Sequence, residues 1–191
     1  MAEITPMMKQ YLEIKEQNKD SILFFRLGDF YEMFNEDAKL AARELDLTLT
    51  SRDRSKPKEE QTPMCGVPYH SVDSYIARLV QKGYKVAICE QMEDPALAKG
   101  LVERDITRIV TPGTVTESCM LDENKNNYMG CVYGEGGRFG LAFCDISTGA
   151  FFVTLCADAQ SVASELGRFS PSEVMRFGTD VNDEAIEDAL F

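Results

Sequence analysis

Along the first 110 positions, segments with the apolar spacing of a helix alternate with segments typical of a strand. Thr5-Pro6 places a hydroxyl cap and a proline at a helix start. The apolar, aromatic run at 22–27 is typical of a buried strand and meets a turn signal at Gly28-Asp29. The pattern also predicts a helix capped by Asn35, with Glu36 and Asp37 in its first turn. A strand at 47–50 and a polar loop at 51–63 are expected next. A helix then follows Ser71 and ends at Gly83, and two strands are expected at 84–88 and 106–110.

The second part of the chain changes to strands separated by glycine-rich turns. Strands are expected at 128–133, 140–146 and 150–156, followed by a helix through Val162 and Phe169, a strand at 173–177 and a helix around 183–190. The polar stretch at 112–127 is typical of a linker between domains. In this second part, three strands, a helix, a strand and a helix predict an α/β layer fold that stops before completion.

The charge distribution argues against an ordinary DNA-binding module. The chain has 191 residues and a net charge of −12. Residues 1–117 hold 16 basic and 20 acidic side chains, giving −4, and residues 118–191 hold 4 and 12, giving −8. Neither half is basic, so any DNA contact must be local, or other parts of a larger protein must neutralise most phosphates.

Several classes of protein and site do not fit the composition. No apolar run reaches the ~18 residues that would span a bilayer, and the N-terminus does not look like a secretory signal. The single histidine, His70, makes a zinc cluster improbable, so we expect no metal and an ordinary loop or helix-start role for it. The chain has six cysteines, Cys65, Cys89, Cys119, Cys131, Cys144 and Cys156, which form no C-x-x-C pair and favour a reducing cytoplasm. Five of the six lie beside apolar neighbours and are expected to be small buried side chains.

The segment Gly28–Phe34 holds three aromatic residues directly after a turn. If Phe30 is exposed there, its ring could wedge between base pairs, as apolar side chains of minor-groove proteins do. A mispaired step costs less to unstack, which would favour binding at mispairs. In a strand Glu32 shares a face with Phe30, and its carboxyl group could hydrogen-bond a displaced base. The alternative is that Phe30 and Phe34 are core residues and Glu32 is solvated.

Two further segments could contact DNA. The loop Arg52–Lys58 is the one clear concentration of basic residues and could bind phosphates, or could simply be a solvated loop. Gly66 would allow close backbone approach to a ligand, although Pro63–His70 could equally be an ordinary connection into the following helix.

Five ordered strings resemble the MutS family of mismatch repair proteins. They lie between residues 5 and 114 and are very improbable together by chance: Thr5-Pro6-Met7-Met8-Lys9-Gln10-Tyr11, Arg26-Leu27-Gly28-Asp29-Phe30-Tyr31-Glu32, Pro63-Met64-Cys65-Gly66-Val67-Pro68-Tyr69-His70, Val86-Ala87-Ile88-Cys89-Glu90-Gln91 and Arg108-Ile109-Val110-Thr111-Pro112-Gly113-Thr114.

The resemblance implies a mixed-sheet mismatch-recognition domain at 1–113, a linker at 114–126 and a partial ribonuclease-H-like connector domain at 127–191. It implies that Phe30 intercalates and that Glu32 hydrogen-bonds the mispaired base of duplex DNA carrying mismatches or small insertion/deletion loops. MutL is the expected partner of the connector, and a homodimer the expected parent assembly. Candidate backbone or groove contacts are Arg52, Arg54, Lys56, Lys58, Met64, Gly66, Arg104 and Arg108.

The family's lever, clamp and ATPase domains have no counterpart in this sequence. No G-x-x-x-x-G-K-[ST] string occurs, so the chain has no P-loop. We therefore expect no enzymatic activity and no cofactor here, with ATP and Mg²⁺ bound by the ATPase part of a bacterial, cytoplasmic parent protein that associates with the nucleoid when it binds DNA.

Two rival functions remain open from the residues alone. Asp145 ends a predicted strand, like the first acidic strand of ribonuclease-H-like nucleases, but lacks clear companions for two metal ions. The alternative to a nuclease site is that Asp145 is a structural aspartate in the turn after a strand. The second rival is a protein-interaction fragment that has no DNA affinity.

Overall fold

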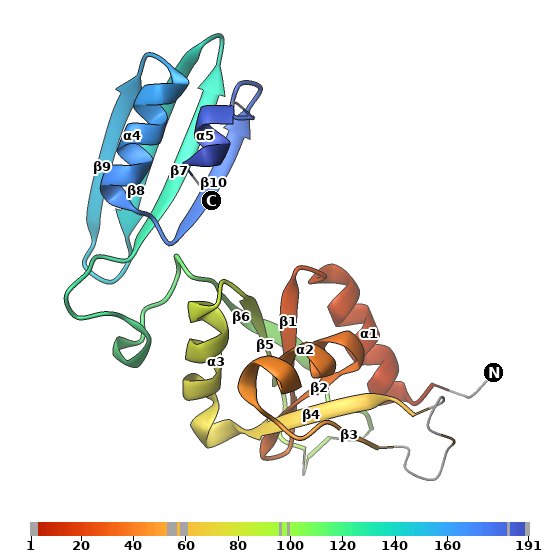
Figure 1. The fold of residues 1–191 in the computed structure, drawn as a ribbon. Coiled ribbons are helices and arrows are strands. Elements are labelled where there is room, and N and C mark those ends of the chain that lie inside the picture. Colours follow the sequence, from red (N-terminus) through yellow and green to blue (C-terminus); the bar gives the residue numbers. More distant parts are fainter. Residues whose placement is uncertain are drawn as a thin grey trace. The chain divides into compact units, whose positions relative to one another are not determined.

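The computed structural model describes residues 4–52, 57, 61–95, 97–98, 100–182 and 184–189. The chain divides into two compact units, residues 1–111 and 112–191. Each unit has its own sheet with helices packed on it (Figure 1). The fold class predicted from the sequence, α/β with mixed sheets, is confirmed.

The first unit has a six-stranded sheet in the order β3-β4-β2-β1-β5-β6. Neighbouring strands are antiparallel except β1 and β5, which are parallel. The strands are β1 (Ser21–Leu27), β2 (Phe30–Phe34), β3 (Thr50–Ser51), β4 (Pro63–Pro68), β5 (Lys85–Gln91) and β6 (Arg104–Val110). The helices are α1 (Pro6–Gln17), α2 (Asn35–Leu45), the 3-10 turn η2 (Tyr69–Ser71) and α3 (Val72–Gln81).

The predicted starts of the first two helices have different outcomes. Thr5 caps α1 as expected, since its hydroxyl oxygen accepts a hydrogen bond from the Met8 amide at 3.3 Å. The prediction that Asn35 caps α2 is wrong, because Phe34 occupies the N-cap and makes no side-chain cap bond. The strand predicted at 47–50 is also wrong, since only Thr50 and Ser51 are in β3.

Strand β4 was not predicted as a strand, yet it pairs with both β2 and β3. Its sequence contains a glycine and begins and ends with proline, a composition that disfavours strands. Pro63 and Pro68 stand at its ends, where a missing amide hydrogen costs least.

A buried carboxylate joins the first two helices to the sheet. Asp37 accepts hydrogen bonds from the Leu23 amide at 2.9 Å and from the Tyr11 hydroxyl at 3.4 Å, and pairs with Lys15 at 3.0 Å. Asp37 therefore does more than place charge at a helix start. The core beside Tyr11 contains the buried residues Leu23, Phe25, Phe34, Ala87 and Cys89.

The second unit has a four-stranded sheet in the order β10-β7-β8-β9, with β10 parallel to β7 and the other neighbours antiparallel. Helices α4 and α5 lie against one face (Figure 1). The elements match those predicted: β7 (Tyr128–Glu135), β8 (Arg138–Asp145), β9 (Ala150–Cys156), α4 (Ala159–Phe169), β10 (Glu173–Gly178) and α5 (Glu184–Asp188), after the 3-10 turn η3 (Ser118–Met120).

The two faces of this second sheet differ in burial. The face under α4 and α5 carries the core, including Val132, Leu141 and Phe143. Strand alternation turns a second set of apolar side chains to the other face. Those exposed there are Tyr133, Phe151, Val153, Leu155, Met175 and Phe177. Within the described ranges, no helix is long and apolar enough to cross a membrane.

Candidate nucleic-acid interface

The two-residue turn between β1 and β2 presents Phe30 to solvent. Gly28 takes a positive φ of 60°, which glycine adopts without strain. Phe30 follows as the first residue of β2, opposite Leu27 in β1 and Pro68 in β4. Its side chain is 47% exposed, so the exposure expected from the sequence is observed.

Glu32 lies on the same face of β2 as Phe30, because side chains two apart along a strand point the same way. Its side chain is only 16% exposed, so it is recessed where the Phe30 ring protrudes. Gly66 of β4 stands directly opposite Glu32. A Cβ atom on Gly66 would lie 3.5 Å from Glu32 Cγ and 3.2 Å from the Tyr31 carbonyl oxygen. The absence of a side chain at Gly66 thus lets Glu32 and the Tyr31 carbonyl group lie close to the backbone of β4.

The carboxyl group of Glu32 has few polar interaction partners. Its Oε2 atom is buried and has no hydrogen bond within the part of the chain that the structure describes. Arg52 Nε lies 3.8 Å from the same atom, an ion pair too long for a hydrogen bond. Burial raises the pKa of Glu32, and the charge of Arg52 opposes that rise. This carboxyl group can therefore take up a proton or accept a donor from a bound molecule.

The other predicted contacts within the described residues are spread over both faces of the sheet. Met64 lies opposite Phe34 and is half-buried against the core on the α1 side. Arg108 pairs with Ile88 in β5, on the face opposite to Phe30. Of the predicted basic loop, Arg52 belongs to the described residues, while Arg54, Lys56 and Lys58 lie outside them.

Arg104, another predicted contact, is buried and already bonded. Its Nε donates to the Arg26 carbonyl oxygen at 2.8 Å, and Nη1 donates to Gln10 Oε1 at 3.0 Å and to the Val102 carbonyl oxygen at 2.9 Å. The guanidinium carbon lies 5.0 Å from the Phe25 ring centroid, and burial lowers the pKa of Arg104. These contacts tie β6 to β1 and α1, which favours a structural role.

Asp145, the centre of the rival nuclease hypothesis, is fully buried at the end of β8. Its Oδ1 accepts from the amide and hydroxyl of Ser147 at 2.9 and 2.6 Å and from the Thr148 amide at 3.3 Å. Its Oδ2 accepts from Asn126 Nδ2 at 2.8 Å and from the Asn127 amide at 3.1 Å. Both oxygens therefore hold a turn and the preceding segment, which does not favour metal-dependent cleavage.

The sulfur and imidazole groups do not assemble into a reactive centre. Cys65, Cys89 and Cys156 are buried, and burial raises the pKa of the Cys65 thiol to about 11. Cys131 and Cys144 are half-buried and Cys119 is exposed, so fewer cysteines are fully buried than the five expected. His70 lies in η2, directly before α3, as expected. In the described portion, no three His, Cys, Asp or Glu side chains stand close enough to hold a metal ion.

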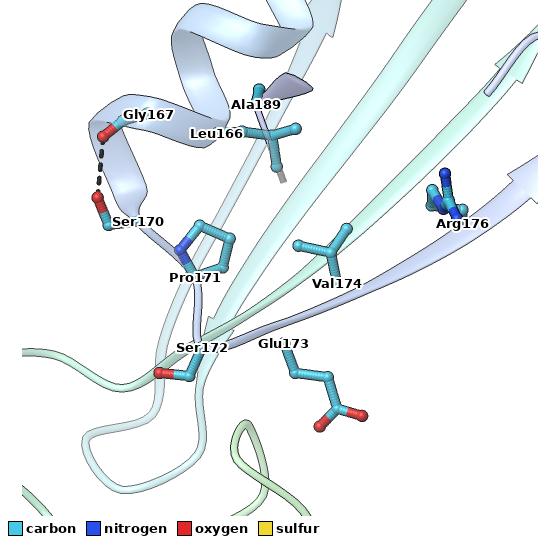
Figure 2. Close-up of a pocket in the computed structure, with 9 residues that line it drawn as sticks. All are labelled: Leu166, Gly167, Ser170, Pro171, Ser172, Glu173, Val174, Arg176 and Ala189. Carbon is cyan, nitrogen blue, oxygen red and sulfur yellow. Dashed lines mark hydrogen bonds between the residues drawn. The ribbon is translucent and has the colours of Figure 1, made fainter. Parts of the chain in front are cut away.

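A pocket of about 490 Å³ lies in the second unit, between the end of α4 and the start of β10 (Figure 2). Its charged lining residues already have partners. Arg176 pairs with Glu187 at 2.5 Å, and Glu173 accepts a hydrogen bond from the Gly113 amide at 3.2 Å. None of the residues predicted to bind DNA lines this pocket.

Gly66→Val is expected to destabilise the first unit by about 1–3 kcal/mol, because the added side chain would overpack the space beside Glu32. Urea unfolding followed by circular dichroism measures this loss. Gly167→Ala is the matched control, since a Cβ there meets nothing within 4 Å and α4 favours alanine over glycine. An unchanged urea midpoint for Gly66→Val would contradict the tight fit.

Comparison with known proteins places both units in one family. Residues 5–119 match the model of MutS domain I, and residues 127–185 match that of MutS domain II. Three similar curated proteins are DNA mismatch repair proteins MutS. That of Acetivibrio thermocellus is 59% identical over 100% of this chain and 22% of its own length. That of Ruminiclostridium cellulolyticum is 58% identical over 98% and 21%, and that of Syntrophomonas wolfei is 57% identical over 94% and 21%.

The chain thus spans about a fifth of the length of the curated relatives it matches. The two domain matches cover most of it, in the order that the resemblance to the MutS family implies. The chain belongs to the MutS family.

Proposed function

We propose that this chain recognises mispairs and small insertion/deletion loops in duplex DNA as part of a mismatch repair protein. The observation that carries the proposal is the exposed Phe30 ring beside the recessed carboxyl group of Glu32. The domain matches and the names of the relatives support it.

Phe30 acts as an apolar wedge in this proposal. It enters a base step, unstacks it and bends the duplex, as apolar side chains of minor-groove proteins do. Matched steps resist this insertion more than mispaired steps, because stacking and pairing must be broken. Preference for mispairs then follows from the energy of deformation and needs no reading of base sequence.

Glu32 supplies the polar contact to the displaced base. Its Oε2 is buried and has no hydrogen bond within the described residues, so its acceptor capacity is still available for a base donor. The carboxylate carries a charge that DNA repels, and protonation removes that charge. Arg52, half-exposed beside Glu32, is placed to contact a phosphate when DNA is bound.

The remaining functions concern a longer protein of the relatives' length. We propose that its other parts bind ATP and Mg²⁺ and hydrolyse ATP, that it forms a homodimer, and that the second unit contacts MutL. A cytoplasmic bacterial protein associated with the nucleoid when DNA-bound fits this role. These proposals rest on family membership.

The affinity for mismatched DNA is expected to rise as pH falls from 8 to 6. Burial raises the pKa of Glu32 in the free protein, and nearby phosphates raise it further in the complex. The protonated form binds without charge repulsion, so the dissociation constant falls as pH falls. Fluorescence anisotropy with the full-length protein at several pH values measures this.

Glu32→Gln is the matched variant, because its amide keeps the size of the side chain and cannot ionise. Its dissociation constant is expected to vary by less than about twofold over the same pH range. An equal pH dependence in both proteins would show that another group titrates, and would remove Glu32 from the mechanism.

A further inference from the structure

We infer that Arg26 and Tyr69 are positioning residues that fix the turn before Phe30 and so hold its ring ready for insertion. The inference rests on the proposed function and adds two residues to it. It follows from a cluster of contacts on the face of the sheet opposite to Phe30.

Arg26 holds the turn from the β1 side. Its Nε donates to the Gly28 carbonyl oxygen at 2.5 Å. Its guanidinium lies 3.9 Å from the centroid of the Tyr69 ring and 5.4 Å from that of Tyr31, and Nη1 is 3.7 Å from Glu90 Oε2. A planar guanidinium between two rings, with a carboxylate at its end, has little freedom to move.

Tyr69 holds the same turn from the β4 side. Its amide donates to the Asp29 carbonyl oxygen at 2.9 Å, while its ring covers the Arg26 guanidinium. The carbonyl groups of both turn residues, Gly28 and Asp29, are therefore bonded to residues outside the turn. The next residue along the chain is Phe30.

Tyr31 and Glu90 complete the cluster. The Tyr31 hydroxyl donates to Glu90 Oε1, and burial together with that hydrogen bond raises the pKa of Tyr31 to about 12. The phenol therefore remains a donor at neutral pH. Glu90 in β5 is thus fixed by both Tyr31 and Arg26, which ties the turn to the parallel pair of strands at the sheet centre.

These residues act on Phe30 through the backbone. Arg26 and Tyr31 are a cross-strand pair whose side chains point away from the face that carries Phe30 and Glu32. A ring held in its bound orientation loses less conformational freedom on insertion than a ring on a mobile turn. Loosening the turn should therefore weaken binding at mispairs more than binding to matched DNA.

The test is a double-mutant cycle in the full-length protein. Arg26→Gln is expected to lower mismatch affinity about tenfold and matched-duplex affinity by less than about twofold. In a Phe30→Ala background, the same Arg26→Gln change should cost less than about twofold more, because Arg26 acts only through the ring. Anisotropy titrations with both duplexes give all the affinities.

A second pair of variants separates the ring of Tyr69 from its hydroxyl group. Tyr69→Phe keeps the ring over Arg26 and should bind mispairs like the parent, whereas Tyr69→Ala should lose affinity like Arg26→Gln. Thermal unfolding reports any general loss of structure, and the selectivity ratio between the two duplexes is compared only among variants that remain folded.

Three outcomes distinguish failure of the inference from failure of the proposed function. If Phe30→Ala lowers the affinity for mispaired DNA but neither Arg26→Gln nor Tyr69→Ala does, the positioning role is wrong and the insertion of Phe30 is still supported. If Arg26→Gln costs the same with and without the Phe30 ring, Arg26 contacts DNA independently and the inference fails. If Phe30→Ala changes nothing, the proposed function fails and the inference with it.

Discussion

Phe30→Ala is expected to lower affinity for a mispaired duplex by about 5- to 150-fold and affinity for a matched duplex by less than about twofold. The range follows from base–aromatic stacking worth about 1–3 kcal/mol. Matched DNA loses little because insertion into a well-stacked step is already unfavourable. The 47% exposed ring is free to make this contact without rearrangement of the core.

The measurement is an anisotropy titration of the full-length protein with matched and mispaired duplexes at several salt concentrations. Salt should weaken both complexes through phosphate contacts, while the ratio between them stays near constant. Phe151→Ala is the matched control, since Phe151 is an exposed phenylalanine on the second sheet. Equal selectivity of the parent protein and Phe30→Ala would contradict the wedge.

Asp145→Ala is expected to destabilise the second unit by about 2–4 kcal/mol. The change would remove the buried carboxylate that accepts part-buried hydrogen bonds from Ser147, Asn126 and Asn127, and losing several hydrogen bonds to a charged group is costly. Asp145→Asn should also destabilise, because either orientation of its amide turns an NH₂ group toward these donors. Urea unfolding of both variants measures the loss, and parent-like midpoints would refute the structural role.

The contribution of Asp145 to the stability of the second unit depends on pH in a defined direction. Burial alone would raise the pKa of Asp145, but the hydrogen bonds from Ser147, Asn126, Asn127 and Thr148 outweigh it and hold the pKa well below its usual range. A depressed folded pKa stabilises the fold above the unfolded value of about 3.9. The contribution is lost as pH falls below that value. A metal-dependent nuclease assay, with Asp145→Asn as comparison, separates this role from the rival hypothesis.

Sequence patterns predicted most of the fold because most elements are long and periodic. The α3 residues Ile76, Leu79 and Val80 repeat at helical spacing, and all are buried. Strand β8 alternates regularly between buried and more exposed positions, and glycine-rich turns separate the first three strands of the second sheet. The turn at Gly28-Asp29 followed by Phe30 was also readable, since a turn leaves the first strand residue near solvent.

The parts that could not be predicted depend on contacts between distant segments. Strand β4 is stabilised by pairing on both sides, which outweighs the poor strand preference of its proline and glycine residues. Arg104 looked like a candidate DNA contact, but its partners come from α1 and β1, far away in sequence.

The sequence contains an indication of the cluster formed by Arg26, Tyr31, Tyr69 and Glu90. A charged residue within the apolar run at 22–27 needs a buried or stacked partner, and Glu90 at the end of the β5 run needs one as well. Pairing the two would have required knowledge that β1 and β5 are parallel neighbours. Register, which sequence periodicity does not specify, was the missing information.

Insertion of the Phe30 ring is tested most directly by a fluorescent base placed beside the mispair. 2-Aminopurine brightens when it loses stacking, so binding of the full-length protein should increase its emission next to a mispair and leave it nearly unchanged in matched DNA. Phe30→Ala, at concentrations that saturate the duplex, should abolish the increase. An equal increase with Phe30→Ala, or none with the parent protein, would contradict recognition by this ring.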